Sequence, residues 1–422
     1  MNSEAEAGPL ISPQISKRRT IGLYLGVLPS AGGMFQYAQC ILEALTELQS
    51  EGYGLVVAYG DASWHPILKR STAPHVQLKN WKLGERIASY LMAAHLPPKM
   101  TLALSASINP LTAEMAALQC DLWVFPAQDA LSWQVEGKKI STIHDLMHRY
   151  ERRFPEAGSW LRYVVREHRF RNLAKASAIL VDSETGRQQV CESYGTPGSR
   201  IFVLPYIAPS HILSGSERAD FEQHYPFPEK YFYYPAQFWP HKNHLRLLEA
   251  FAGARQNCPD MALVLSGGEK HDFPKVKAKV QELGLEKVVH FLGYVPNADL
   301  AGIYRRARGL IMPTFFGPTN IPPLEAMACA CPVMVSDIYG MREQCGDAAL
   351  YFDPASADQI RHAMESLWKD DALYDRLAVK GRKRAAMWGQ CEFNSRLSKI
   401  VSEILPGVPR LPEGWGNCTF GI

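Results

Sequence analysis

Apolar positions along the chain follow two alternating periods. Runs such as TIGLYLGVL, GLVVAYG and DLWVFPA are almost continuously apolar, and between the first two Ala38, Ile41 and Leu45 recur at helical spacing. Strands buried in a parallel sheet are apolar on both faces, whereas an amphipathic helix places apolar residues three and four positions apart. The alternation therefore predicts βαβ units and parallel sheets.

A second series of the same kind follows a polar stretch that is poor in strands, and it includes KYFYYPAQ, ALVLSGG, KVVHFLGYV, RGLIMPTF and CPVMVSD. At 422 residues the chain is longer than one hydrophobic core usually organises. We predict an α/β protein with two Rossmann-like domains. The expected parts are a disordered tail (1–17), an N-terminal domain (18–207), a linker (208–229), a C-terminal domain (230–387) and a helix with a tail that packs back on the N-terminal domain (388–422).

The composition is that of an ordinary globular protein, with 47% hydrophobic and 21% charged residues, and no apolar run approaches the roughly 18 to 20 residues that cross a bilayer. The first 17 residues lack the apolar core of a secretion signal. We therefore expect a cytoplasmic protein with at most peripheral membrane contact. Nine cysteines without framework spacing indicate reduced thiols, and Cys329 and Cys331 are interpreted as small apolar fillers rather than metal ligands.

The net charge of +3 is too small to indicate a nucleic-acid partner, but the segment from His148 to Lys175 is basic. Three acidic residues in it stand against eight cations, namely Arg149, Arg152, Arg153, Arg162, Arg166, Arg169, Arg171 and Lys175. Two interpretations stay open. The segment is either a solvated helix face or, because Trp160, Tyr163 and Phe170 interleave with the cations, a surface for anionic lipid or a lipid-diphosphate acceptor.

In open α/β sheets, ligands gather at the carboxyl ends of the strands, where loops enter helices. The first strand ends in VLPSAGGMFQYAQ, whose Gly32 and Gly33 let the backbone approach a phosphate or a sugar, although a plain tight turn needs the same residues. STIHDLMHRY places His144 and Asp145 at another strand end. The histidine belongs either to the site or to the core, and Asp145 is able to cap the next helix.

Loops of the second series add further candidates. HKNHLRLLEAF places Lys242 at a helix boundary, where it can meet a phosphate as a point charge. LSGG, with Gly267, and FLGYV, with Tyr294, lie at strand ends, where they either surround a flat base or form turns. FFGPTNIPPLEAMA is a loop that enters a helix through paired prolines, with Glu325 in the first helical turn.

Together these segments resemble the retaining nucleotide-sugar glycosyltransferases of the GT-B fold, family 4. The resemblance extends from about Ile21 to Trp388. It is carried by SAGGMFQY, TIHDL followed by FPE, AILVDSETGR, HKNHLRLLEAF, VHFLGYVPNADLAGIYRRA, and PTFFGPTNIPPLEAMACACPVMVSD followed by GDAALYFDP. The last block is the most specific.

The resemblance implies two facing domains with a nucleotide diphosphate sugar in the cleft, held mainly by the second domain. It assigns Glu325 to the ribose hydroxyls, the Gly293-Tyr294-Val295 backbone to the base and Lys242 to the diphosphate. It also implies that His144 lies beside the transferred sugar and that Gly33 lies near the anomeric carbon. Such folds need no metal ion or other cofactor.

The physical chemistry of the residues agrees with these roles. A helix dipole keeps a carboxylate in the first turn ionised, and the carboxylate of Glu325 can accept two hydrogen bonds from a vicinal diol. The expected phosphate donors are the N–H groups of Asn320 and Ile321, because Pro322 and Pro323 have none.

Two positions depart from the family pattern. The family has two glutamates eight positions apart, and Gly317 stands where the first should be. The family also places an arginine six residues before the lysine, where this chain has Ala236, with Gln237 beside it. We expect Thr319 and Asn320 either to replace the missing sugar contacts or simply to shape a turn.

The sequence thus predicts a retaining glycosyltransferase that moves a hexose, with mannose suggested, from a nucleotide sugar to a glycan or lipid-linked glycan during surface polysaccharide assembly. Gly317 and Ala236 keep two alternatives open: a catalytically silent subunit that grips the nucleotide sugar, and a GT-B epimerase or phosphorylase.

Overall fold

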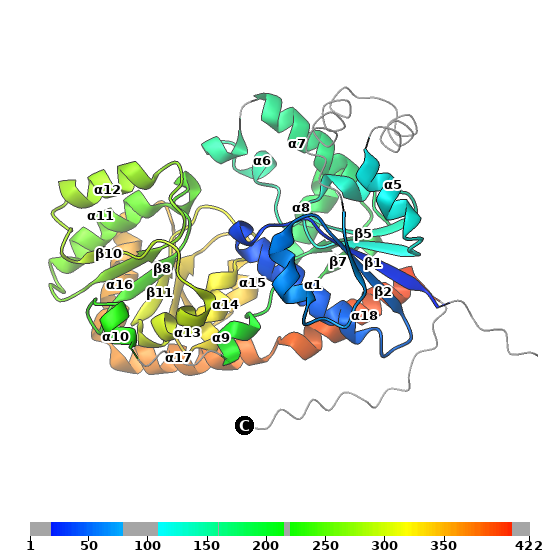
Figure 1. Ribbon diagram of the computed structural model, residues 1–422. Helices are drawn as coiled ribbons and strands as arrows, with labels where there is room; N and C mark the ends of the chain where they lie inside the picture. Colours follow the sequence, from blue (N-terminus) through cyan, green and yellow to red (C-terminus); the bar gives the residue numbers. More distant parts are fainter. Residues whose placement is uncertain (1–17, 79–108, 159, 215–219, 407–422) are drawn as a thin grey trace, which may run out of the picture.

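The computed structural model describes residues 18–78, 109–158, 160–214 and 220–406, so the predicted tail of residues 1–17 lies outside the described residues. Two sheets organise the described chain, and they lie side by side in Figure 1. Every recorded pair of neighbouring strands is parallel. The predicted α/β class with two Rossmann-like domains is confirmed.

The N-terminal sheet has seven strands in the order β3-β2-β1-β4-β5-β6-β7. They are β1 (Thr20–Leu25), β2 (Gly54–Tyr59), β3 (His75–Gln77), β4 (Leu122–Phe125), β5 (Lys138–Thr142), β6 (Ala178–Val181) and β7 (Ile201–Val203). The helices of this half are α1 (Gly33–Glu47), α2 (His65–Leu68), α5 (Pro110–Ala117), α6 (Met147–Tyr150), α7 (Trp160–Leu173) and α8 (Glu184–Tyr194). Short 3₁₀ turns are η1 (Pro29–Ala31), η2 (Ala62–Trp64), η3 (Ala130–Trp133), η4 (Pro155–Ala157) and η5 (Gly198–Arg200).

The C-terminal sheet has six strands in the order β10-β9-β8-β11-β12-β13. They are β8 (Phe232–Pro235), β9 (Leu263–Ser266), β10 (Val289–Phe291), β11 (Gly309–Met312), β12 (Val333–Ser336) and β13 (Ala349–Phe352). The helices and the 3₁₀ turn of this half are η6 (Pro240–Lys242), α11 (His244–Arg255), α12 (Phe273–Glu282), α13 (Asn297–Arg306), α14 (Ile321–Ala328), α15 (Met341–Cys345), α16 (Ala357–Lys369) and α17 (Asp371–Ala386). The predicted linker carries α9 (Ser210–Ser214) and α10 (Phe221–His224).

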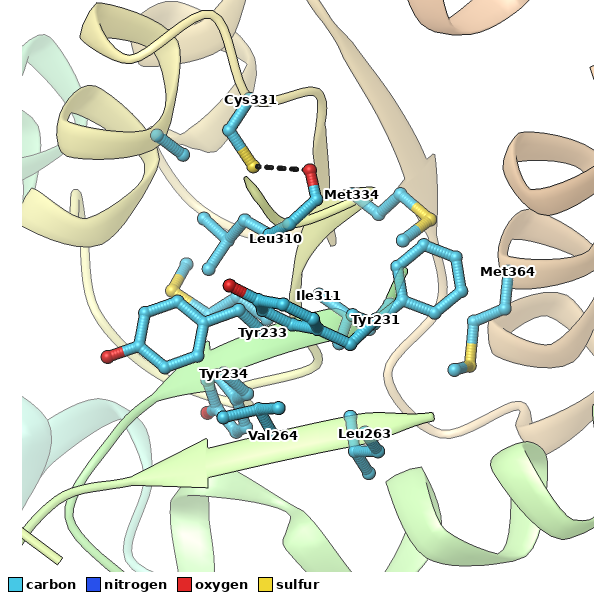
Figure 2. Packing of buried hydrophobic residues seen from close by; sticks show 14 of the residues in the cluster. Tyr231, Tyr233, Tyr234, Leu263, Val264, Leu310, Ile311, Cys331, Met334 and Met364 are labelled. Carbon is cyan, nitrogen blue, oxygen red and sulfur yellow. Dashed lines mark hydrogen bonds between the residues drawn. The ribbon is translucent and has the colours of Figure 1, made fainter. Parts of the chain in front are cut away.

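Buried tyrosines in and beside β8 connect the C-terminal core to the loops above it (Figure 2). Each hydroxyl has a partner: Tyr233 meets Ser266 Oγ at 2.6 Å, and Tyr234 donates to the carbonyl of Lys242 at 2.9 Å. A buried hydroxyl costs free energy unless it is hydrogen-bonded. The core therefore fixes the position of the turn that carries Lys242.

The last helix, α18 (Gln390–Ile404), returns to the N-terminal domain, as predicted. It packs along α1, which Figure 1 shows in blue beside the red helix. Phe393 and Val401 are fully buried in the core of the N-terminal sheet. Lys138 Nζ also donates to the carbonyl of Ile404 at 2.8 Å.

The two domains contact each other through polar groups in and beside the loops between them. The Thr319 hydroxyl donates to the Asp182 carboxylate, and the N–H of Glu184 donates to Glu343 Oε1 at 3.0 Å. None of the helices in the described part of the chain combines the length and the apolar character that a membrane span requires.

Candidate active site

Two helix N-termini face each other between the domains. Helix α1 begins at Gly33 and helix α14 at Ile321. A Cβ on Gly33 would lie only 3.0 Å from Ile321 Cδ1, so a side chain at position 33 would crowd the opposite domain. Gly32, the N-cap of α1, has a φ of +60°, which glycine adopts most readily. The N–H of Ile321 and the N–H of Gly33, each at the start of its helix, are suited to bind an anion.

Glu325 is buried where the two domains meet, but the helical position predicted for it is wrong. Helix α14 begins at Ile321, so Glu325 stands in the second turn and the first turn has no acidic residue. The side chain is 5% exposed, and its Oε2 accepts from the Tyr304 hydroxyl at 2.7 Å. Burial raises the pKa of Glu325 to about 7, although hydrogen bonds from Tyr304 and from Gln36 of the N-terminal domain oppose the shift. The expectation of a dipole-stabilised carboxylate is therefore corrected.

Lys242 ends the η6 turn at the carboxyl end of β8. Its Nζ donates to Asn320 Oδ1, the N-cap residue of α14, at 3.5 Å. Desolvation lowers the pKa of the Lys242 ammonium to about 8, while Asp145 and Glu156 act in the opposite direction. A half-buried cation at the entrance of α14 is well placed for a diphosphate.

The loop before α14 is held by contacts with its neighbours. Asn320 N–H donates to Gln344 Oε1 at 3.1 Å, and Gln344 Nε2 donates to the Asn320 carbonyl at 2.7 Å. Asn320 N–H is therefore engaged, which corrects its prediction as a phosphate donor. Gly317 has a φ of +134°, and a Cβ there would lie 2.6 Å from Asn320 Nδ2. The Asn320 amide thus fills the space beside Gly317, where the family pattern has a glutamate.

His144 is buried in the N-terminal domain, and both of its ring nitrogens are engaged. Because a carbonyl only accepts, Nε2–H donates to Pro126 O at 3.0 Å, and Nδ1 accepts from the Tyr206 hydroxyl at 2.8 Å. Burial lowers the pKa of His144 to about 4, so the ring is neutral at pH 7. Asp145 Oδ1 accepts from the N–H of Met147, the first residue of α6, at 3.0 Å, although the N-cap of that helix is Leu146 and not Asp145 as the sequence allowed.

The loops after β8, β9 and β10 are joined to one another. Gly267 N–H donates to Gly293 O at 2.8 Å, and a Cβ on Gly267 would lie 2.4 Å from Ala236 O, so only glycine fits. Gln237 accepts from Trp239 Nε1 at 2.9 Å. Tyr294 is 79% exposed, whereas Val295 is buried. These loops form a continuous surface on which a flat base can lie.

The sequence reasoning missed four residues, Gln36, Asp182, Tyr304 and Gln344. Asp182 follows β6, and the strand-end rule applied to AILVDSETGR would have found it. Burial raises the pKa of Asp182 to about 7, although Thr319 and Ser183 donate to it. No local pattern indicated Tyr304, which lies 21 positions before Glu325.

Cys329 and Cys331, which are separated by one residue, belong to the core rather than to the candidate site. Cys329 and Cys331 are 7% and 2% exposed, and Cys331 is labelled in the cluster of Figure 2. Burial raises the pKa of the Cys329 thiol to about 11. Within the described residues, no group of three or more histidines, cysteines and carboxylates could hold a metal ion.

Comparison with known proteins agrees with this architecture. Residues 216–384 match the family model of the glycosyl transferases group 1. HepE from Anabaena, solved in complex with UDP and glucose, superposes with a TM-score of 0.70 over 92% of this chain and 100% of its own, at 17% identity. WaaG, a glycosyltransferase involved in lipopolysaccharide biosynthesis, has a TM-score of 0.66 over 92% of this chain and 100% of its own, at 16% identity. The fold is GT-B.

A curated relative covers part of this GT-B chain. The O-antigen chain mannosyltransferase B of Escherichia coli is 30% identical over 230 residues, which are 52% of this chain and 59% of that protein. The match thus spans about three fifths of the relative.

Proposed function

We propose that the protein is a retaining glycosyltransferase, which transfers a hexose from a nucleotide diphosphate sugar to a glycan or lipid-linked glycan in surface polysaccharide biosynthesis. One observation carries the proposal. Lys242 Nζ donates to Asn320, the N-cap residue of α14, and the same helix carries the N–H of Ile321 at its start and the Glu325 carboxylate in its second turn, which are groups that a diphosphate and a ribose require.

The relatives support the substrate class. The family model covers the residues that form this wall, and the Anabaena structure binds UDP and glucose. The Escherichia coli relative is an O-antigen mannosyltransferase, which favours mannose as the sugar and a polysaccharide as the product. Tyr294, Gly293 and Gly267 line the place proposed for the base.

The proposed mechanism needs no enzymatic nucleophile. Among the carboxylates near the proposed site in the described chain, Asp145 accepts from the N–H of Met147, Asp182 accepts from Thr319 and Glu325 accepts from Tyr304. The bond from the anomeric carbon to the diphosphate breaks, and the bond to the acceptor oxygen forms on the same face. The acceptor proton passes to the leaving diphosphate, whose charge is stabilised by Lys242 and the N–H of Ile321.

His144 is proposed to shape the sugar pocket as a neutral ring. With Nε2 and Nδ1 engaged by Pro126 and Tyr206, the ring presents no free nitrogen for proton transfer. A pKa of about 4 also makes it a poor base at pH 7.

The experiment that tests the function is a donor panel. The protein is incubated with GDP-mannose, UDP-glucose and other nucleotide sugars, with and without acceptor glycans, while nucleotide release and product configuration are followed. Acceptor-dependent release with an unchanged anomeric configuration supports the proposal. Inversion of the configuration contradicts retention.

A second candidate is a silent nucleotide-sugar-binding subunit. It is favoured by Gly317 and Ala236, because neither supplies the charged contact that the family pattern places there. Binding of a nucleotide sugar without transfer from any donor would support it. Release or epimerisation without an acceptor would instead favour an epimerase, and phosphate-dependent cleavage would favour a phosphorylase.

The basic segment supports a further part of the proposal, contact with an anionic membrane from the cytoplasmic side. Trp160, at the start of α7, is 78% exposed, and Arg162 beside it is also exposed. Other cations are engaged internally: Glu167 pairs with Arg149 and with Arg171. The proposed contact is therefore the first turn of α7, an exposed aromatic next to a cation.

A further inference from the structure

Residues 151–156 of the N-terminal domain form a segment that reaches over to the C-terminal domain. The hydroxyl of Tyr339 donates to Glu151 Oε1 at 2.8 Å. The Arg153 guanidinium lies 4.6 Å from the centre of the Phe315 ring, and the rings of Phe154 and Phe315 are 5.5 Å apart. Phe315 belongs to the loop between β11 and α14, so the segment contacts the loop that leads to the proposed donor site.

The segment ends in a two-point contact between Glu156 and His241. Glu156 Oε1 accepts from the backbone N–H of His241 at 3.1 Å and from its ring Nδ1 at 2.7 Å. The two side chains are only 10% and 13% exposed. Hydrogen bonds from His241 lower the pKa of Glu156 despite its burial, and desolvation lowers the pKa of His241, so an ionised carboxylate accepts from a neutral ring. Glu156 Oε2 is buried without a hydrogen-bond partner in the described chain.

His241 precedes Lys242, and the whole turn is held from both domains. The His241 carbonyl accepts from the N–H of Phe315 at 2.8 Å and from Thr314 Oγ1 at 3.2 Å. The Lys242 carbonyl accepts from Tyr234. Glu156 thus supplies the contact from the N-terminal domain to a turn whose remaining backbone groups are fixed by the C-terminal domain.

Glu156 is also joined to helix α7, the helical part of the basic segment. Its carbonyl accepts from Arg166 Nη1 at 2.8 Å, and Arg166 lies on α7. A chain of hydrogen bonds therefore runs from α7 through Glu156 to the turn that carries Lys242.

We propose that Glu156 is a positioning residue that acts through His241, fixing the Lys242 ammonium in the donor site when the two domains are closed. The inference rests on the proposed role of Lys242 toward the diphosphate. It extends that role, because the acceptor-side domain then determines whether the donor-side cation is in place. An error of about 1 Å in the position of a catalytic group can cost about a hundredfold in rate.

A double-mutant cycle tests the proposal. Glu156→Ala and His241→Ala should each lower kcat at least about tenfold, and the double variant should be no slower than Glu156→Ala, since His241→Ala removes one of the two hydrogen bonds that Glu156→Ala removes. Glu156→Gln keeps an oxygen that can accept from both N–H groups, so it should recover part of the lost kcat. Unfolding temperatures show whether the variants are folded.

Tyr339→Phe serves as the matched control. It removes the other cross-domain hydrogen bond of the segment, to Glu151, without touching the contact between Glu156 and His241. Its kcat should stay within about twofold of the wild type. Additive effects of Glu156→Ala and His241→Ala, or an unchanged kcat in a folded Glu156→Ala variant, would overturn the inference.

Binding separates this inference from the proposed function. Calorimetry with UDP and GDP, together with small-angle scattering, measures affinity and domain closure without turnover. Weaker binding and less closure in Glu156→Ala, non-additive with His241→Ala, support the inference even if the wild type transfers no sugar. A wild type that transfers sugar while Glu156→Ala binds, closes and turns over normally refutes the inference and leaves the function standing.

Discussion

Glu325 carries the largest expected effect of any single residue on nucleotide binding. Replacing it with alanine would leave ribose hydroxyls buried without an acceptor, at a cost of about 1 to 3 kcal/mol. We therefore expect Glu325→Ala to weaken the binding of UDP or GDP, whichever binds the wild type, roughly tenfold to hundredfold in calorimetry. Unchanged affinity would mean that Glu325 does not contact the ribose.

The raised pKa of Glu325 gives a pH dependence of known sign. Burial moves the pKa from 4.5 in the unfolded chain to about 7, so the folded protein holds this proton more tightly. The stability it contributes is complete below about pH 4.5 and is lost as the pH rises to about 7. Relative to Glu325→Gln, the unfolding temperature of the wild type should fall between pH 5 and pH 7 and then level off. If the difference in unfolding temperature between the wild type and Glu325→Gln did not change with pH, the pKa of Glu325 would not be raised in the folded protein.

Asn320 lies beside the position where the family pattern has a glutamate, and we expect its amide to replace the sugar contact of that glutamate. Its amide lies against Gly317 and accepts from Lys242. Asn320→Ala should lower kcat with the true donor about tenfold, because a sugar contact is lost, while leaving the affinity for UDP or GDP within about twofold, because the Lys242 ammonium is still present to meet the diphosphate. Full turnover in both Asn320→Ala and Thr319→Ala would show that the loop merely forms a turn.

At the scale of elements, helix α7 determines the membrane prediction. Arg166 holds the carbonyl of Glu156 and is unsuitable for the test, so the exposed Trp160 and Arg162 are chosen. A Trp160→Ala, Arg162→Glu variant should lose binding to phosphatidylglycerol vesicles, and wild-type binding should weaken with salt because exposed charges are screened beyond about 8 to 10 Å. Phosphatidylcholine vesicles are the control. Equal vesicle binding by the variant and the wild type would mean that the basic segment is only a solvated helix face.

The elements themselves could be predicted because their signals are local. TIGLYLGVL and RGLIMPTF contain β1 and β11, and the helical spacing around Ile41 corresponds to α1. The paired prolines predict a helix that starts with them, whereas α14 already begins at Ile321. That shift moved Glu325 into the second turn.

The partners of the site residues could not be predicted in the same way. Asp182 and Thr319 are 137 positions apart, and Glu156 and His241 are 85 apart. No period within one strand or helix carries information on such pairs, because they depend on how two domains face each other. The family resemblance marked the correct loops, but it did not indicate that Asn320 N–H is engaged by Gln344.

At the scale of the whole molecule, helix α18 is expected to be essential for the N-terminal domain. Phe393 is fully buried and meets the Tyr37 ring edge-on at 5.8 Å, and Tyr37 in turn packs against His144 at 5.1 Å. Phe393→Ala should destabilise the protein by about 3 to 5 kcal/mol, measured by denaturant unfolding. Val379→Ala, at a site that is 70% exposed, is the control and should be nearly neutral. Equal stability of the two variants would contradict a structural role for α18.

The packing of α18 on the N-terminal domain affects how the chain folds while it is being translated. The core that α18 completes combines residues of β1, β2, β4, β5 and β6 with a helix that follows the entire C-terminal sheet in the chain. On the ribosome, the first domain emerges early but lacks the apolar surface of Phe393, Leu397 and Val401 until the second domain has been translated. The second domain is continuous in sequence and can fold as soon as it leaves the exit tunnel. The order in which the two domains are completed is therefore the reverse of the order in which they are begun.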